Sequence, residues 1–295
     1  MTPESPESPR RAIVLGGGGI AGIAWHLGML AELLDGGVPL GEADLVIGTS
    51  AGSVAGSILR FGQVQLVYSM QATADMPDLP SGDPTVAPVD MATFRDRLVT
   101  AIQGATSAED ARARLGRAAV ESSAGGSESV LVSTLAAQFP ALFGWPASAL
   151  GICVVDATTG EFRVLDKSSG VALSRAVAAS CSVPLVFPPV EIDGVPYIDG
   201  GARSATNADV VAGFDKVLVL SCGPEDPASP MGPQLDAAVA GLRNSGADVL
   251  LLGADADSLA AFGTNSLAPT SRVPSAQAGR RQAAGELDAV RAFWG

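Results

Sequence analysis

Ser50 lies between two glycines, in the sequence Gly48-Thr49-Ser50-Ala51-Gly52, where a strand-like pattern changes to a helix-like one. Gly-x-Ser-x-Gly in this context predicts a nucleophile elbow, a strained turn that projects the serine hydroxyl from the edge of a sheet. Gly48 and Gly52 are needed because side chains there would collide across so sharp a turn. A helix starting at Ala51 would direct its N–H groups toward developing negative charge. A glycine-rich turn with a serine N-cap is the alternative.

A second glycine-rich motif, GGGGIAG, follows the first strand-like run and contains Gly17-x-Gly19-x-x-Gly22. This spacing matches a dinucleotide-binding fingerprint, which requires an acidic residue at the end of the second strand. That strand instead runs into the Ser50 motif. We therefore interpret the loop as an oxyanion hole, with the amides of Gly17, Gly18 and Gly19 as donors.

Ser50 needs a proton acceptor, and the chain has a single histidine, His26. His26 is almost two turns into the helix that follows the glycine loop, so we interpret it as a structural residue. Asp199, in the sequence YIDGGA, is the better candidate, because it ends a short strand and is followed by Gly200 and Gly201. A carboxylate can take the serine proton directly, and partial burial would raise its pKa and make it a stronger base. The alternative is that Asp-Gly only marks a turn.

The positions of these motifs follow from the predicted elements. Strand, helix, strand and helix are predicted at 11–15, 20–34, 43–48 and 51–59, which indicates a parallel sheet with right-handed crossovers. Hairpins are predicted within 151–166 and 190–201. Further strands are expected at 215–220 and 247–252, and a last helix at 275–294.

Other parts of the chain have a different composition. Residues 1–10 are polar and Pro-rich, and we expect a disordered N-terminal arm. Residues 62–147 are rich in Ala, Ser and Asp, and we interpret them as a helical insertion over one edge of the sheet, with helices near 91–104, 108–122 and 128–138. Residues 223–295 are expected to form a C-terminal extension packed on the same domain.

Composition excludes several functions. The chain has 295 residues with 18 Lys and Arg against 31 Asp and Glu, a net charge of −13, so nucleic acid is not an expected partner. Three scattered cysteines and one histidine argue against a structural zinc site, and no metal is expected. No apolar run reaches the roughly 18 residues of a membrane span. The polar N-terminus is not a signal peptide, so we expect a cytoplasmic protein.

Together the motifs GGGGIAG, GTSAGS and DGG, in this order, resemble those of the patatin-like phospholipases, and in particular of the bacterial branch. The segment SRAVAASCSVPLVFPPVEIDGVPYIDGG adds to the resemblance, because the family often carries Ala-Ser-x-x-x-Pro before its aspartate. The similarity spans about residues 11–222, which would form a patatin-like hydrolase domain that includes the insertion.

The resemblance implies an α/β fold, namely a three-layer α/β/α patatin-like sandwich with a mainly parallel sheet. It implies a Ser-Asp dyad, here Ser50 and Asp199, and an oxyanion hole at Gly17–Gly19. Members hydrolyse esters of phospholipids and other acyl lipids, so a lipid or other ester substrate, transient contact with a membrane surface and no cofactor are expected. Ala21 stands where the family usually has Arg or Lys. Neutral esters and acylglycerols therefore stay open as substrates beside phospholipids.

Two other functions remain as alternatives to a serine acyl hydrolase. One is a dinucleotide-binding oxidoreductase that uses the glycine-rich loop, and the other is a non-catalytic lipid-binding relative. The oligomeric state is not indicated by the sequence.

Overall fold

The computed structural model describes residues 8–73, 91–123, 131–133, 135, 139 and 144–295. Its centre is a sheet of eight strands in the order β5-β6-β3-β2-β1-β7-β8, with β4 also paired to β3. Five strands are parallel: β1 (Arg11–Leu15), β2 (Leu45–Thr49), β3 (Leu150–Asp156), β7 (Lys216–Ser221) and β8 (Asp248–Gly253). Three short strands complete it: β4 (Phe162–Leu165), β5 (Val190–Ile192) and β6 (Val195–Asp199).

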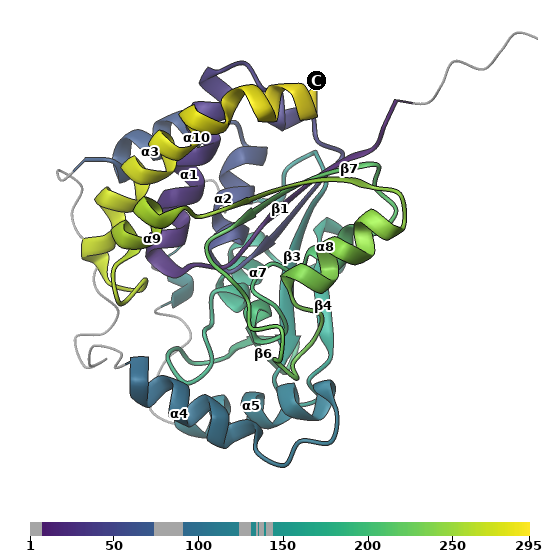
Figure 1. Ribbon diagram of the computed structural model, residues 1–295. Coiled ribbons are helices and arrows are strands. Elements are labelled where there is room, and N and C mark those ends of the chain that lie inside the picture. Colours follow the sequence, from purple (N-terminus) through teal and green to yellow (C-terminus); the bar gives the residue numbers. More distant parts are fainter. Residues whose placement is uncertain (1–7, 74–90, 124–130, 134, 136–138, 140–143) are drawn as a thin grey trace, which may run out of the picture.

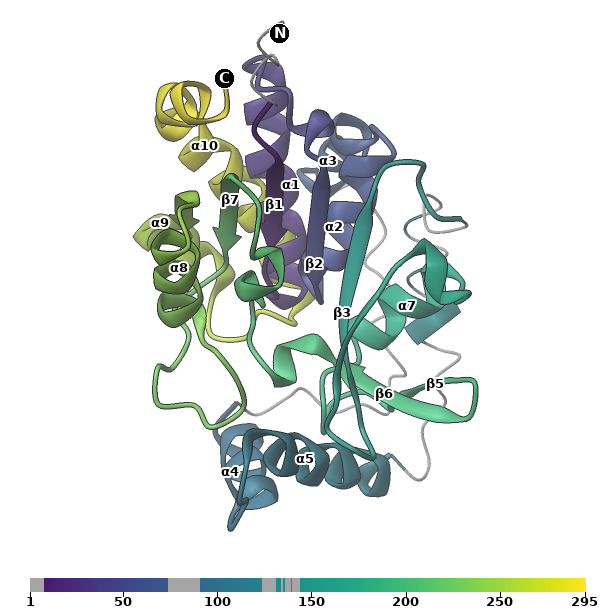
Figure 2. The same ribbon diagram turned by 90° about the vertical axis from the view of Figure 1, so that its right-hand side faces the viewer.

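Helices cover both faces of the sheet (Figures 1 and 2). One face carries α1 (Gly19–Asp35), α2 (Ala51–Arg60), α3 (Val64–Gln71), α7 (Leu173–Ser180), α9 (Ala256–Phe262) and α10 (Arg272–Trp294). The opposite face carries α8 (Leu235–Asn244) and the short 3₁₀ helix Ala208–Val211. This arrangement confirms the predicted three-layer α/β/α sandwich.

The buried strand β1 shows why both faces must be covered. Ile13 and Leu15 point into the apolar core beneath α1, α2 and α10, whereas Ala12 and Val14 point into the core beneath α8. All four side chains are fully buried. A strand that is apolar on both faces requires a helical layer on each side, as in other parallel sheets.

Helices α4 (Met91–Ile102) and α5 (Ala108–Ser122) lie apart from these layers, below the sheet in Figures 1 and 2. Ala111 and Leu115 of α5 pack against Val155 at the end of β3 and Ile198 near the end of β6. The predicted helices at 91–104 and 108–122 are therefore present, and they reach the sheet at the end where β3 and β6 meet.

Most predicted elements are present with small shifts of their boundaries. The hairpin at 190–201 turns at Asp193 and Gly194, both with positive φ, as an Asp-Gly turn requires. The last helix begins at Arg272, three residues before the predicted start. Helix α3 was not predicted. Residues 1–7 of the expected arm, and much of the expected helix at 128–138, lie outside the described residues.

Candidate active site

Ser50 occupies the turn between β2 and α2 with a φ of 51°. Positive φ is unfavourable for a serine and costs about 1–3 kcal/mol, so the surrounding fold has to hold it. A Cβ on Gly48 would lie 2.5 Å from the Gly52 carbonyl oxygen, and a Cβ on Gly52 would overlap the Leu15 carbonyl oxygen. Positions 48 and 52 therefore accept only glycine. The turn places Ser50 at the carboxyl end of the parallel strands.

The backbone of Ser50 is fixed by a neighbouring helix. Its N–H donates to Ser180 Oγ at 2.8 Å, and Ser180 Oγ donates to the Cys153 carbonyl of β3 at 2.8 Å. The Ser50 carbonyl accepts from Ser53 Oγ at 2.6 Å in the first turn of α2. Ser180 thus connects the nucleophile candidate to the central strand.

Asp199 ends β6 and lies beside the same part of β3. In the sheet register Thr49 pairs with Cys153, and Asp199 pairs with Val154. Thr49 and Asp199 therefore flank β3 on its two sides, opposite consecutive residues of that strand. The Asp199 N–H donates to the Ser182 carbonyl at 2.9 Å, and Asp199 Oδ1 accepts from the Gly201 N–H at 2.7 Å.

The Asp199 carboxyl is buried, with only 4% of the residue exposed. Burial raises its pKa to about 7, while hydrogen bonds from the Ser50 side chain and from the Gly201 backbone lower it. The Ser50 side chain thus lies close enough to this carboxyl to lower its pKa, although burial has the larger effect. A carboxylate with a raised pKa is a much better proton acceptor than an exposed aspartate.

The glycine-rich loop runs from the end of β1 past Ser50 into α1. A Cβ on Gly17 would lie 3.4 Å from the Ser50 Cβ, so the loop is in contact with the nucleophile candidate. Gly19 has a φ of +62° and begins α1. Gly22 lets the loop approach α2, because a Cβ there would lie 3.1 Å from the Ala51 Cβ.

The prediction for Gly17 needs a correction. Its N–H donates to the Ala205 carbonyl at 2.8 Å, in the loop that follows Asp199. This amide is engaged in holding the two loops together and does not face a substrate. The amides of Gly18 and Gly19 have no hydrogen-bond acceptor among the described residues, so two of the three expected donors remain.

His26 is fully buried on α1 and lies beneath the glycine-rich loop. Its Nε2 donates to the Gly16 carbonyl at 2.7 Å and lies 3.4 Å from Cys222 Sγ. Burial lowers the pKa of His26 to about 4, although the hydrogen bond with Gly16 raises it. In the described part of the chain neither Ser50 nor Asp199 is among its hydrogen-bond partners. Its contacts are those of a residue that supports the loop.

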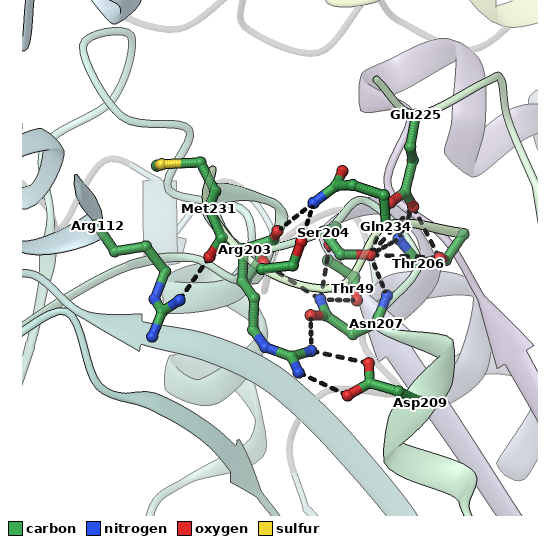
Figure 3. A network of polar contacts seen from close by, with 12 residues as sticks. Thr49, Arg112, Arg203, Ser204, Thr206, Asn207, Asp209, Glu225, Met231 and Gln234 are labelled. Carbon is green, nitrogen blue, oxygen red and sulfur yellow. Dashed lines mark hydrogen bonds and ion pairs between the residues drawn. The ribbon is translucent and has the colours of Figure 1, made fainter. Parts of the chain in front are cut away.

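Figure 3 shows a polar network that links the ends of β2 and β6. Asn207 is fully buried, and its Nδ2 donates to Thr49 Oγ1 at 3.1 Å and to the Gly200 carbonyl at 3.2 Å. These acceptors belong to the residue before Ser50 and the residue after Asp199. The Arg203 guanidinium donates a hydrogen bond to Asn207 Oδ1 at 2.9 Å and also forms an ion pair with the Asp209 carboxylate.

Glu225 organises the other side of this network. Its carboxylate accepts from the hydroxyls of Ser204 and Thr206 and from the backbone N–H of Thr206 and Leu235. Leu235 begins α8, so the carboxylate also lies at a helix N-terminus, where the helix dipole favours negative charge. The loop after Asp199 is therefore attached to β2 through Asn207, to the glycine-rich loop through Ala205 and to α8 through Glu225.

A family model described as patatin-like phospholipase matches residues 13–212. The chain belongs to this family. Ser50, Asp199 and the glycine-rich loop of this patatin-like protein all lie within the matched residues, and membership supports the function of a lipid hydrolase.

Solved structures with a similar fold include VipD from Legionella pneumophila, with a TM-score of 0.49 and 15% sequence identity over 96% of this chain and 67% of VipD. The type III effector protein ExoU gives a TM-score of 0.41 and 17% identity over 97% of this chain and 54% of ExoU. A complex of ExoU with SpcU from Pseudomonas aeruginosa gives a TM-score of 0.43 and 15% sequence identity over 97% of this chain and 53% of the matched chain. The patatin-like chain thus spans about half the length of ExoU. No curated protein sequence matches it significantly.

Several residues that shape the site of this patatin-like protein were not singled out from the sequence. Ser180 and Ser182 belong to the Ala-Ser-x-x-x-Pro segment, which was noticed only as part of the resemblance. Cys181, between them, is half-buried, and its Sγ lies 3.9 Å from Ser53 Oγ, while burial raises the pKa of its thiol to about 12. Asn207 had no local signal, because its partners are distant in sequence.

Two further observations concern ligands and membranes. Within the ranges that the structure describes, no group of three or more His, Cys, Asp or Glu side chains is arranged to hold a metal ion. None of the described helices is both long and apolar enough to cross a bilayer.

Proposed function

We propose that this patatin-like protein is a serine acyl hydrolase of lipid esters, of the phospholipase A, lipase or esterase type. Ser50 is the nucleophile and Asp199 is the general base in this proposal. The observation that carries it is the arrangement at the end of β3, where the residue before Ser50 pairs with Cys153 and the buried Asp199 pairs with Val154. Burial also raises the pKa of Asp199 to about 7. The strained backbone of Ser50 adds support, because such strain persists where geometry serves a function.

In the proposed first step, Asp199 accepts the Ser50 proton while Ser50 Oγ bonds to the ester carbonyl carbon. The carbonyl oxygen becomes negatively charged and is stabilised by the amides of Gly18 and Gly19 at the N-terminus of α1. The bond to the alcohol then breaks, and the alcohol leaves with the proton from Asp199. Ser50 is left as an acyl ester.

The second step uses water as the nucleophile. Asp199 takes one proton from water as its oxygen bonds to the acyl carbon. The intermediate collapses, Ser50 Oγ leaves and recovers the proton from Asp199, and the carboxylic acid is released. Asp199 thus serves as base and acid in turn, and the mechanism needs no histidine.

A dinucleotide-binding oxidoreductase is disfavoured by the surroundings of α1. A bound pyrophosphate would use the free N–H groups of the first helical turn. The Ala21 N–H in that turn instead donates to the Ser266 carbonyl at 3.0 Å. The end of β2 also carries Ser50 where the fingerprint needs an acidic residue.

The proposal is tested by hydrolysis of a panel of phosphatidylcholine, diacylglycerol and p-nitrophenyl esters by the purified chain. We expect release of free acid from at least one class, and a loss of at least about 10³-fold in kcat for both Ser50→Ala and Asp199→Asn. Hydrolysis that persists in both variants would show that another site is responsible. A wild-type chain that binds lipid but hydrolyses no ester would favour the non-catalytic alternative.

A further inference from the structure

A short segment between α9 and α10, residues 263–269, lies directly against the glycine-rich loop although it is outside the family match at 13–212. The carbonyl of Ser266 accepts the Ala21 N–H at 3.0 Å. A Cβ on Gly19 would lie 2.8 Å from this carbonyl oxygen and 2.9 Å from Leu267 Cδ2. Backbone and side chain of the segment therefore contact the residue that begins α1.

The segment has a defined local conformation. The Leu267 N–H donates to Asn265 Oδ1 at 3.0 Å, and the Ala268 N–H donates to the Asn265 carbonyl at 3.0 Å. These bonds form a turn around Asn265 and orient Leu267. The segment thus presents Leu267 to the loop from a fixed backbone.

The helix that follows anchors the segment to the rest of the fold. Arg272, at the start of α10, is buried and donates to the carbonyls of Met70 and Gln71 at 3.0 and 3.1 Å. Helix α10 packs along α1, which itself begins at Gly19. Leu267 is therefore held at a set position relative to the proposed oxyanion donors.

Leu267 is only partly buried, and its Cδ2 lies beside Gly19. An ester whose carbonyl oxygen is bound by the Gly18 and Gly19 amides would place one of its two substituents there. The acyl chain is the apolar one, whereas glycerol or a phosphate headgroup is polar. An aliphatic side chain favours contact with the acyl chain.

We propose that Leu267 is a specificity-determining residue that contacts the acyl chain of the substrate close to its carbonyl carbon. This inference rests on the proposed function. It assigns part of the acyl-binding surface to a segment outside the residues that the family model matches.

The test measures kcat/KM for p-nitrophenyl acetate, butyrate, hexanoate and octanoate with wild type, Leu267→Ala and Leu267→Phe. Loss of contact with one or two methylene groups is expected to lower kcat/KM of Leu267→Ala for octanoate about 4- to 15-fold, with less than about twofold change for acetate. Leu267→Phe, which narrows the space, is expected to discriminate against octanoate while acetate is again little affected.

Leu259→Ala is the matched control, because Leu259 is an exposed leucine on the neighbouring helix α9. It should leave the octanoate-to-acetate ratio unchanged. An octanoate-to-acetate ratio that stays within about twofold of wild type in both Leu267 variants would overturn the inference. If the wild-type chain hydrolyses neither these esters nor phosphatidylcholine and diacylglycerol, the proposed function itself fails.

Discussion

At Asp199, burial and the neighbouring polar groups have opposite effects on the pKa of the carboxyl. Burial raises the pKa of the carboxyl, whereas the Ser50 hydroxyl and the Gly201 N–H stabilise its charged form, and burial dominates to give a pKa of about 7. The proposed base needs the ionised form. The fraction of competent enzyme therefore rises with pH until the carboxyl has lost its proton.

We accordingly expect kcat/KM for a neutral ester to increase about tenfold per pH unit below about pH 7 and to level off above it. The measurement is a pH profile from 5 to 9 with p-nitrophenyl butyrate, followed at the isosbestic wavelength of the product. His26 has a pKa of about 4, so it should not contribute to the rise of kcat/KM between pH 5 and 7. A profile that is flat from pH 5 to 8 would contradict the assignment of Asp199.

At the scale of the elements, the C-terminal end of α7 holds both members of the proposed dyad. The hydroxyl oxygen of Ser180 accepts a hydrogen bond from the Ser50 N–H, and the backbone carbonyl of Ser182, two residues after the helix ends, accepts one from the Asp199 N–H. The hydroxyl of Ser182 has a different task, since it donates to the Pro188 carbonyl at 2.6 Å. Two serines in neighbouring positions can therefore be compared directly.

Ser180→Ala leaves the buried Ser50 N–H without an acceptor and releases the link to Cys153. We expect a loss of about 1–3 kcal/mol in the free energy of unfolding, measured with urea, together with a fall in kcat of about tenfold or more. Ser182→Ala removes a comparable hydrogen bond and should lose similar stability, but its kcat should stay within about twofold of wild type. Equal kcat in the two variants would show that Ser180 has no special role in positioning Ser50.

The strands that carry Ser50 and Asp199 are also coupled through Asn207. Asn207→Asp keeps the shape of the side chain but replaces the donating amide by oxygens that face Thr49 Oγ1 and the Gly200 carbonyl. Because small misplacements of reacting groups are costly, we expect kcat to fall about 10- to 100-fold. KM should change by less than about threefold. Steady-state kinetics decides this, and an effect on KM alone would place Asn207 in substrate binding instead.

At the scale of the whole molecule, helix α1, which follows the glycine-rich loop, packs against α10 from the C-terminal part of the chain. Helix α10 crosses α1 at very short distance, since a Cβ on Gly28 would overlap the Ala276 carbonyl and a Cβ on Gly279 would overlap the Trp25 carbonyl (Figure 1). This contact fixes α1, whose first turn belongs to the proposed oxyanion hole.

Gly279→Ala should therefore destabilise the protein by about 1–3 kcal/mol, because the helices have to move apart. Gly285→Ala on the same helix is the control, since a Cβ there meets no atom within 4 Å. Alanine has the higher helix propensity, so this variant is expected to be neutral or up to about 1 kcal/mol more stable. Urea unfolding of both variants measures the difference, and equal effects would contradict the close crossing.

Local signals explain which parts of the fold were predictable. The strands are short buried apolar runs, the hairpin turns at Asp193–Gly194, and the Ser50 turn is set by glycines two positions away. Helix α3 was missed because only Val64, Val67 and Gln71 are buried along it and it depends on packing against α1 and α10. The partners of the Gly17 amide and of Asn207 were also not predictable, since these contacts join segments far apart in sequence.

The central claim is that Ser50 is an activated nucleophile whose base is Asp199. Labelling with an alkyl fluorophosphonate, followed by mass spectrometry of the digested protein, tests it most directly, because Ser50 Oγ would displace fluoride and keep the phosphonyl group. The account predicts a single adduct on Ser50, no adduct in Ser50→Ala, and labelling slowed by at least about 100-fold in Asp199→Asn. An adduct on another residue, or equal rates in wild type and Asp199→Asn, would contradict it.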